Sequence, residues 1–460
     1  MPGTSDTVVN SSSSFYTHIK DDQTLRRLFH SLIMSISELK SEIAPEHLKS
    51  EQLRSHGNCN NLLTLQEIQD IVNRALEDGA TVQKFSVKPC SDSEYGVLAS
   101  HQRLTVEVKT RSGRDEVLSF FIKAVPQDAP ELAEYISDRL VFLKEKIFYH
   151  DIIPQLYHGY EKERWSPNCY LIKENLLVFE DLSLKGYSLA EKVLNKELIE
   201  SGLASIARVH ACSLLAEARL GKSLKRLYPS AFVENSFIET GKTRTRYEVA
   251  VNAIVTIAEY LGLDTSMIRQ ACEHVYPSLE TSSTKRNVVS HGDLWANNML
   301  FSNTVPPHCL LIDFQMVRYL PLAHDVAQFL YLCADRDFRL VWESAMLKHY
   351  YNVLCETVNS AKSISVEVPP WSELIEGMEE QRLPAIISAA VFFQNTLMDG
   401  KTGREILSNP SKYHDFEFKT RNKIVLEFMK TDPVYNKCMS QIVTELTEFS
   451  FRLDQLPKPT

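Results

Sequence analysis

The chain has 460 residues, of which 44% are hydrophobic and 24% charged, and its formal net charge is −9. Such a length predicts two lobes or domains. An excess of acidic over basic residues does not favour the basic face that nucleic-acid binding requires. The nine cysteines are scattered without a C-x-x-C pair, which indicates reduced thiols. The N-terminus lacks a signal-peptide pattern, and the most apolar stretch, residues 383–393, is too short to span a bilayer. We expect a soluble, cytoplasmic monomer without nucleic-acid or membrane partners.

The first 62 residues are predicted to form an N-terminal extension. Residues 1–21 are polar and rich in serine, a composition typical of disorder. Between Gln23 and Ile43, apolar residues recur every three or four positions, which predicts an amphipathic helix. Packing of this helix on the body of the protein is the favoured interpretation, and a partner-binding role is the alternative.

Residues 63–180 are predicted to form a small lobe around an antiparallel sheet. Leu104, Val106 and Val108 alternate with polar residues, which is the pattern of a half-buried strand. Because a proline disfavours helix at the preceding residue, the longest helix of this section should stop before Pro154. The predicted elements, in chain order, are a helix over 63–76, strands over 84–88, 104–108 and 117–123, a helix over 131–150, and strands over 170–172 and 176–179.

After Glu180 the pattern becomes helical. Apolar residues stand at helical spacing through residues 190–285 and 322–450. Residues 181–460 are therefore predicted to form a second, larger lobe made of helices. The fold class expected from the whole pattern is α+β, with a small β-rich lobe followed by a larger helical one.

The strongest chemical signal lies between residues 288 and 315. It reads VVSHGDLWANNMLF and, after a short turn, LLIDFQ. Asp293 and Asn298 stand five residues apart, the D-x-x-x-x-N spacing of a kinase catalytic loop. That spacing alone arises often by chance, but the surrounding HGDLW, the strand pair and the IDFQ segment give it the context that a motif requires.

A predicted hairpin follows the same motif. Asn298 opens one apolar strand, the chain turns, and the returning strand delivers Asp313 back beside Asn298. An amide and a carboxylate oxygen are suitable ligands for Mg²⁺ on the phosphates of ATP. Asp293 is then the carboxylate that accepts the proton of an attacking hydroxyl group.

A kinase also needs a cation for the nucleotide phosphates. Lys123 ends the strand over 117–123, and the following helix offers carboxylates as ion-pair partners. Glu134, Asp138 and Glu145 fall on one helical face, so periodicity alone leaves the partner open.

Taken together, the segments resemble the ecdysteroid kinase-like family, also called CHK kinase-like, within the choline kinase and aminoglycoside phosphotransferase superfamily. The resemblance covers about residues 63–449, and the HGDLW and DFQ motifs carry most of it. Further matching segments are FLKEKIFY at 142–149, LVFEDL at 177–182 and IARVHACS at 206–213.

The resemblance implies a bilobal, protein-kinase-like fold that uses ATP and Mg²⁺. It implies Glu145 as the partner of Lys123, and Asp293 as the base. Asn298 and Asp313 are the implied metal ligands. The residues Phe179, Glu180 and Leu182 fall in the implied interlobe hinge near the adenine.

One departure from the family pattern concerns the loop over the phosphates. The matching stretch, residues 91–100, contains a single glycine, Gly96, with Ser93 or Ser100 as a further candidate for phosphate contact. Asp92 and Glu94 in the same stretch would repel phosphate.

Other polar residues near the motifs have structural interpretations. Asp325 resembles the family's aspartate after the DFQ strand, but the favoured interpretation is that it caps a helix over 326–332. His291 is expected to fix its loop through hydrogen bonds. His210 lies on an apolar helix face and is expected to be a core histidine. Trp295 packs either against substrate or in the core, and the sequence leaves this open.

The predicted reaction is transfer of the γ-phosphoryl group of ATP to a hydroxyl group. The resemblance implies a steroid such as an ecdysteroid, or a hydroxylated xenobiotic, as the acceptor. We expect a wide, mainly apolar acceptor cleft beside Asp293, lined from residues 190–400. The alternatives are a choline- or ethanolamine-type kinase and a catalytically inactive binding protein with the kinase fold. The chain has no HRD, DFG and APE set, which argues against a protein kinase.

Overall fold

The computed structural model describes residues 62–76, 79–90, 99–126, 133, 136–361, 364–398, 403, 405–406 and 409–460. Within the chain, residues 60–460 form one compact unit. The helix predicted between Gln23 and Ile43, the loop residues Ser93 and Gly96, and Glu134 lie outside the described residues.

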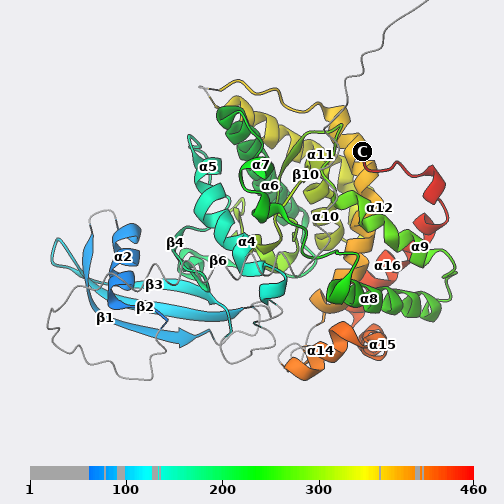
Figure 1. Ribbon diagram of the computed structural model, residues 1–460, viewed down its shortest axis with the longest axis horizontal. Helices are drawn as coiled ribbons and strands as arrows, with labels where there is room; N and C mark the ends of the chain where they lie inside the picture. The colour runs from blue at the N-terminus through cyan, green and yellow to red at the C-terminus, as the bar shows by residue number, and fades with distance from the viewer. Residues whose placement is uncertain are drawn as a thin grey trace, which may run out of the picture. The chain divides into compact units, whose positions relative to one another are not determined.

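A five-stranded antiparallel sheet forms the first part of the compact unit (Figure 1). Its strand order is β1-β2-β3-β5-β4. Helix α2 (Leu65–Ala75) precedes the sheet and begins at Thr64, which forms a capping box with Glu67. The strands are β1 (Ala80–Pro89), β2 (Ser100–Thr110), β3 (Asp115–Ala124), β4 (Cys169–Ile172) and β5 (Leu176–Glu180).

The two faces of this sheet belong to two different cores. Successive side chains of a strand point to opposite faces. On β5, Leu176 and Val178 pack in a core with α2, whereas Leu177 and Phe179 pack in the core of the helical region. On β3, Ile122 belongs to the α2 core. Alternation thus places the neighbouring Lys123 on the face that is turned toward the helical region.

The predicted helix over 131–150 is divided, and the expected stop before Pro154 is wrong. Helix α4 (Val141–Ile147) leads into a π-helical turn (Phe148–Ile152), and α5 (Ile153–Tyr157) follows. Pro154 lies in the first turn of α5. A proline is tolerated there because the N–H groups of a first turn have no partner within the helix.

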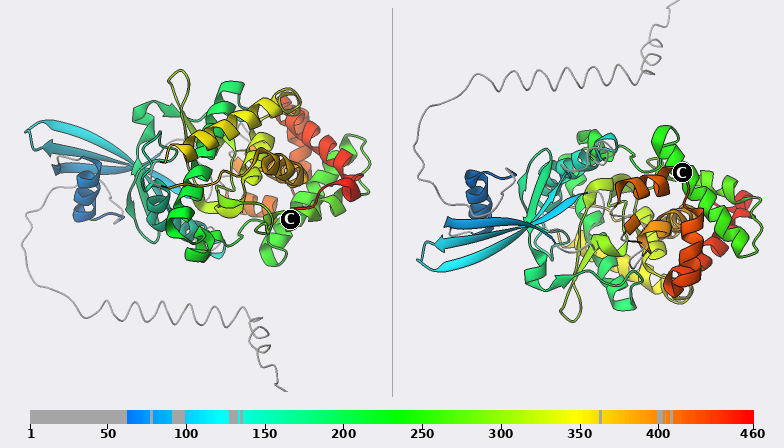
Figure 2. Two further views of the ribbon diagram at one scale, coloured as in Figure 1. Left: turned by 90° about the horizontal axis from the view of Figure 1, so that it is seen from above. Right: turned by 90° about the horizontal axis from the view of Figure 1, so that it is seen from below.

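Helices dominate the region after Glu180, as predicted (Figures 1 and 2). Helix α6 is long and apolar enough to cross a membrane by length and composition, but 67% of its most apolar window is buried inside the protein. The helices are α6 (Lys196–Leu220), α7 (Leu224–Leu227), α8 (Gly241–Tyr260), α9 (Ile268–Cys272), α10 (Leu322–Cys333), α11 (Arg336–Asn359), α12 (Trp371–Thr396), α14 (Pro410–Phe418), α15 (Asn422–Thr431) and α16 (Pro433–Ser450).

Two small sheets interrupt the helical region and carry the motif residues. In the first, β7 (Asn287–Ser290) pairs with β10 (Arg318–Pro321). In the second, β8 (Met299–Ser302) lies between β6 (Tyr187–Ser188) and β9 (Cys309–Leu311). The HGDLW segment therefore links the two sheets, and both of its ends are fixed by strand pairing.

Candidate active site

The hairpin of β8 and β9 brings Asn298 and Asp313 to the same end. Met299 is the register partner of Leu311, and the backbone N–H of Ile312 donates to the carbonyl of Asn298 at 3.0 Å. Asp313 follows directly in the left-handed conformation, with φ of 66°. Asp and Asn are among the few residues other than glycine that enter this region readily.

Lys123 joins two carboxylates that come from distant parts of the chain. Its Nζ lies 2.7 Å from Oε2 of Glu145 on α4 and also contacts Oδ1 of Asp313. Burial opposes the charge on Lys123, but Asp313 and Glu145 outweigh it and raise the pKa of the lysine. The structure thus places Glu145 at the lysine, while Asp138 lies 3.7 Å from Lys242 instead.

Asp293 is buried, with only 8% of its surface exposed. Burial raises its pKa to about 7, and the nearby carboxylate of Asp313 adds to the effect. The amide Nδ2 of Asn298 donates to the carbonyl and to Oδ2 of Asp293, at 2.8 and 3.0 Å. Because both amide protons point to Asp293, the oxygen of Asn298 remains for a metal ion.

The backbone of the HGD segment is held by a carboxylate from α10. Asp325 accepts from the N–H groups of His291 and Gly292, at 2.6 and 3.0 Å. It also lies 3.2 Å from His210, whose other ring nitrogen contacts Tyr350. Burial works against the charge of Asp325, but His210 holds its pKa at about 2. The expected helix cap is wrong, since α10 has no side-chain cap; Asp325 supports the loop instead.

His291 has a structural position, as predicted. Its Nδ1 accepts from the N–H of Asp293 at 3.3 Å, and its Nε2 therefore donates to the carbonyl of Ile312 at 2.8 Å. Burial lowers its pKa, which favours this neutral form. Trp295 packs against the core of the helical region rather than standing free.

Gly292 has a conformation and a position that only glycine fits. Its φ is +76°, and a Cβ there would lie 2.3 Å from the carbonyl oxygen of Met316. The carbonyl of Gly292 accepts from Nη1 of Arg318 at 2.7 Å and from Nε2 of Gln328 at 3.1 Å. Sequence reasoning did not identify Arg318, Gln328 or Asp325 as supports of the loop, because their contacts exist only in the folded chain.

His101 on β2 is a further residue that the sequence did not reveal. It is the register partner of Lys123, and its ring stacks on Phe121 with centroids 5.5 Å apart. Burial lowers its pKa to about 4, and the positive charge of Lys123 acts in the same direction. The histidine is therefore neutral beside the lysine.

The predicted hinge residues are buried in the protein. Phe179 packs edge-on against Tyr149, with ring centroids 4.9 Å apart, and Leu182 is buried. The carboxylate of Glu180 accepts from Arg164, from Lys185 and from the N–H of Asn168. Its side chain is thus engaged within the protein, so a nucleotide contact by Glu180 would have to use the backbone.

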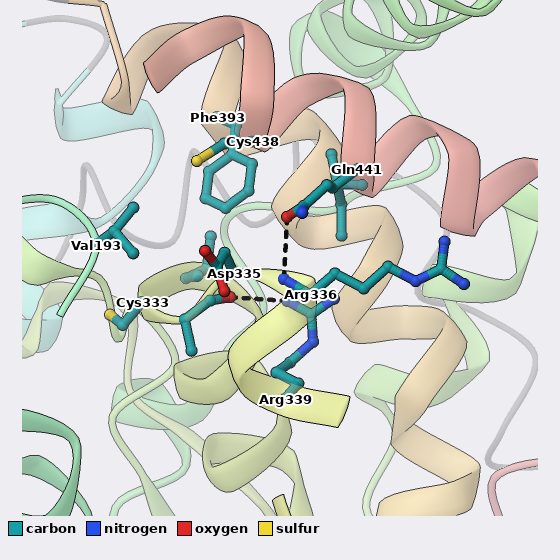
Figure 3. A pocket seen from close by; sticks show the side chains of 11 residues that line it. Val193, Cys333, Asp335, Arg336, Arg339, Phe393, Cys438 and Gln441 are labelled. Carbon is teal, nitrogen blue, oxygen red and sulfur yellow. Dashed lines mark hydrogen bonds between the residues drawn. The ribbon is translucent and has the colours of Figure 1, made fainter. Parts of the chain in front are cut away.

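A crevice lies where α10, α11, α12 and α16 meet (Figure 3). Its walls include Val193, Phe393 and Cys438, and the N–H of Arg336 donates to Oε1 of Gln441 across it at 3.1 Å. Of the candidate catalytic and nucleotide-binding residues that the structure describes, none lines this crevice.

Comparison with known proteins gives a family and distant structural likenesses. A model of the ecdysteroid kinase-like family matches residues 98–363, more than half of the chain. A comparison with curated proteins finds no match. Among solved structures, an ethanolamine kinase from Plasmodium vivax is 13% identical, with a TM-score of 0.37, over 72% of this chain and 82% of its own. A putative aminoglycoside phosphotransferase from Ralstonia eutropha is 10% identical, with a TM-score of 0.39, over 84% and 98%.

Proposed function

Because the chain belongs to the ecdysteroid kinase-like family of small-molecule kinases, we propose that it transfers the γ-phosphoryl group of ATP to a hydroxyl group of a small molecule. The observation that carries this proposal is the convergence of Lys123, Glu145 and Asp313 in one ionic cluster. The Asp293–Asn298 pair completes the set of groups that phosphoryl transfer requires.

Each residue has a distinct role in the proposed reaction. The carboxylate of Asp293 accepts the proton of the attacking hydroxyl while the new O–P bond forms and the bond to the leaving ADP breaks. Lys123, held by Glu145, neutralises phosphate charge.

Asn298 and Asp313 offer hard oxygen ligands of the kind that Mg²⁺ takes together with phosphate oxygens, so the residues fit this ion. When bound, Mg²⁺ supplies charge neutralisation of the phosphates. Phe179, Glu180 and Leu182 are proposed to border the adenine.

The proposed acceptor is an ecdysteroid-like steroid or a hydroxylated xenobiotic. The family description supports this choice, and a rigid polycyclic alcohol would bury apolar area at little entropic cost. A choline- or ethanolamine-type acceptor remains the alternative, and would require aromatic or acidic groups around its cation.

The test is a transfer assay with radiolabelled ATP and a panel of hydroxylated steroids and small amino alcohols. We expect labelled product from polycyclic alcohols, with far higher kcat/KM than from choline or ethanolamine. A higher kcat/KM for choline would overturn the choice of acceptor. Failure to bind Mg-ADP together with absence of transfer would favour an inactive protein that keeps the kinase fold.

A further inference from the structure

The short segment of residues 233–237, between α7 and α8, reaches the helix that carries Glu145. Nζ of Lys144 donates to the carbonyl of Val233 at 2.7 Å and lies 3.2 Å from Oδ1 of Asn235. Nε of Arg139, just before α4, donates to the carbonyl of Asn235 at 2.8 Å. Lys144 is fully buried and Asn235 is 2% exposed, so this contact is removed from water.

The same asparagine also reaches the turn that carries Asp313. Its Nδ2 donates to the carbonyl of Gln315 at 3.2 Å and to the carbonyl of Arg139 at 2.9 Å. Gln315 stands two residues after Asp313, and Lys144 stands one residue before Glu145. One buried amide group therefore fixes the spacing between the two elements whose carboxylates meet at Lys123.

The neighbouring Glu234 acts on a different element, the catalytic loop. Its two oxygens accept from Nε and Nη2 of Arg318, at 2.7 and 3.0 Å. This bidentate pair is geometrically specific and leaves Nη1 of Arg318 to donate to the carbonyl of Gly292 at 2.7 Å. Glu234 is held in turn by the N–H groups of Ser236 and Phe237, at 2.7 and 2.9 Å.

We propose that residues 233–237 form a positioning segment with two separable tasks. Asn235 sets the nucleotide half of the site by joining α4 to the turn after Asp313. Glu234 sets the catalytic loop by orienting Arg318 on the carbonyl that precedes Asp293. Both residues act through others and touch no reacting atom, and the inference rests on the proposed function of the same site.

Two adjacent substitutions should consequently have opposite kinetic signatures. Asn235→Ala is expected to weaken Mg-ADP binding by about 10–100-fold, the range typical of residues that orient ligating groups. Its rate at saturating nucleotide should stay within about threefold of wild type. Glu234→Gln keeps the shape but removes the charge, and should lower the rate at saturating ATP by about 10–100-fold with little change in Mg-ADP affinity.

The experiment uses the full chain and requires no knowledge of the acceptor. Calorimetry gives the Kd of Mg-ADP, and the slow hydrolysis of ATP without acceptor reports on the catalytic loop. Asn287→Ala is the matched control, since this asparagine also ties a loop through its amide, to Ser282 and Lys285, at the opposite end of β7. It should lower the melting temperature to a similar extent and change neither readout.

The outcomes separate this inference from the proposed function. A split of affinity and rate between Asn235→Ala and Glu234→Gln supports the positioning segment. Parallel changes of both readouts in both variants, or variants that behave like Asn287→Ala, overturn it while leaving the proposed function in place. Wild-type protein that binds no Mg-ADP overturns the proposed function and the inference with it.

Discussion

The two halves of the candidate site are held in place by different means. In the nucleotide half, Lys123, Glu145 and Asp313 come from three separate elements and meet through ionic contacts between side chains. In the catalytic loop, the continuous segment around Asp293 is fixed by hydrogen bonds to its backbone from groups behind it, such as Asp325. The ionic contacts between these side chains can exchange partners when phosphate arrives, even though Asn235 fixes the spacing of the elements that carry them. A loop held by its own backbone stays in position. We therefore expect the side chains of the proposed nucleotide half to rearrange on binding, beside a proposed base that is already held in position.

The largest expected effect comes from the preorganised half. Asp293→Asn should lower kcat by about 10²–10⁴-fold, because an amide cannot accept the substrate proton. The melting temperature and the Kd of Mg-ADP should remain close to wild type, since Asn298 still finds an acceptor oxygen at position 293. Steady-state kinetics measures the expected loss of kcat, and calorimetry measures the Kd of Mg-ADP. Turnover within a few-fold of wild type would remove Asp293 from its proposed role.

The nucleotide half should respond in affinity as well as in rate. Asp313→Asn keeps a residue that tolerates the left-handed backbone but removes the charge, and should weaken Mg-ADP binding by about 10–100-fold. Lys123→Met should reduce phosphoryl transfer too. The control is the same titration in the presence of EDTA, where Asp313→Asn should differ much less from wild type. Unchanged Mg-ADP affinity and activity in both variants would contradict the proposed ionic cluster.

The buried carboxylate of Asp293, the proposed base, should also give a characteristic pH dependence. With a pKa of about 7, Asp293 is ionised and able to accept a proton only above that pH. We expect kcat/KM to fall as pH drops below about 7, by up to about tenfold per unit, because this parameter reports the free enzyme. A pH profile of kcat/KM for ATP measures this fall. A profile that stays flat down to pH 5 would show that the carboxylate of the free enzyme is already ionised there.

A smaller effect is expected from loosening the support of the loop. Asp325→Asn replaces one of the two oxygens that accept from the loop by an amide NH₂ group, so one backbone N–H loses its acceptor. We expect this change to lower the free energy of unfolding by about 1–3 kcal/mol. The folded pKa of Asp325, about 2, lies below the unfolded value of about 3.9. The stabilisation that the charged Asp325 provides is therefore complete above the unfolded pKa of about 3.9 and is lost as pH falls toward the folded pKa of about 2. Melting temperatures at pH 7 and pH 3 should show a smaller gap between variant and wild type at pH 3.

The matched control for that variant is Asp151→Asn. Asp151 is a partly exposed carboxylate whose Oδ1 lies 2.8 Å from Nδ1 of the exposed His150, and exposed pairs contribute little. Its melting temperature should equal that of wild type. An Asp325→Asn variant as stable as this control would show that the loop does not depend on the two N–H contacts.

Much of the fold could be predicted from the sequence, because apolar residues that alternate along a strand or recur at helical spacing indicate which side chains are buried. The strand around Leu104, Val106 and Val108 is confirmed, although β2 extends further at both ends. The break between α4 and α5 could not be predicted, since a π-helical turn depends on packing around it. The proposed boundaries at residues 62 and 180 remain predictions.

The site shows a similar division between local and distant information. The motif predicted the hairpin of Asn298 and Asp313, because both strands lie within a short stretch of chain. Periodicity left the partner of Lys123 open. The family resemblance implied Glu145, and the folded structure places Glu145 there. Arg318 and Glu234 stand 84 residues apart in the sequence, so no local sequence pattern predicts their pairing.

The most direct test of the comparison is one paired titration. Mg-ADP is titrated into wild type, Asp293→Asn and Asp313→Asn under the same conditions by calorimetry. We expect Asp293→Asn to bind within about threefold of wild type and Asp313→Asn to lose about 10–100-fold in affinity. Equal losses in both variants, or a greater loss in Asp293→Asn, would contradict the division of the site into a nucleotide half and a separately held base.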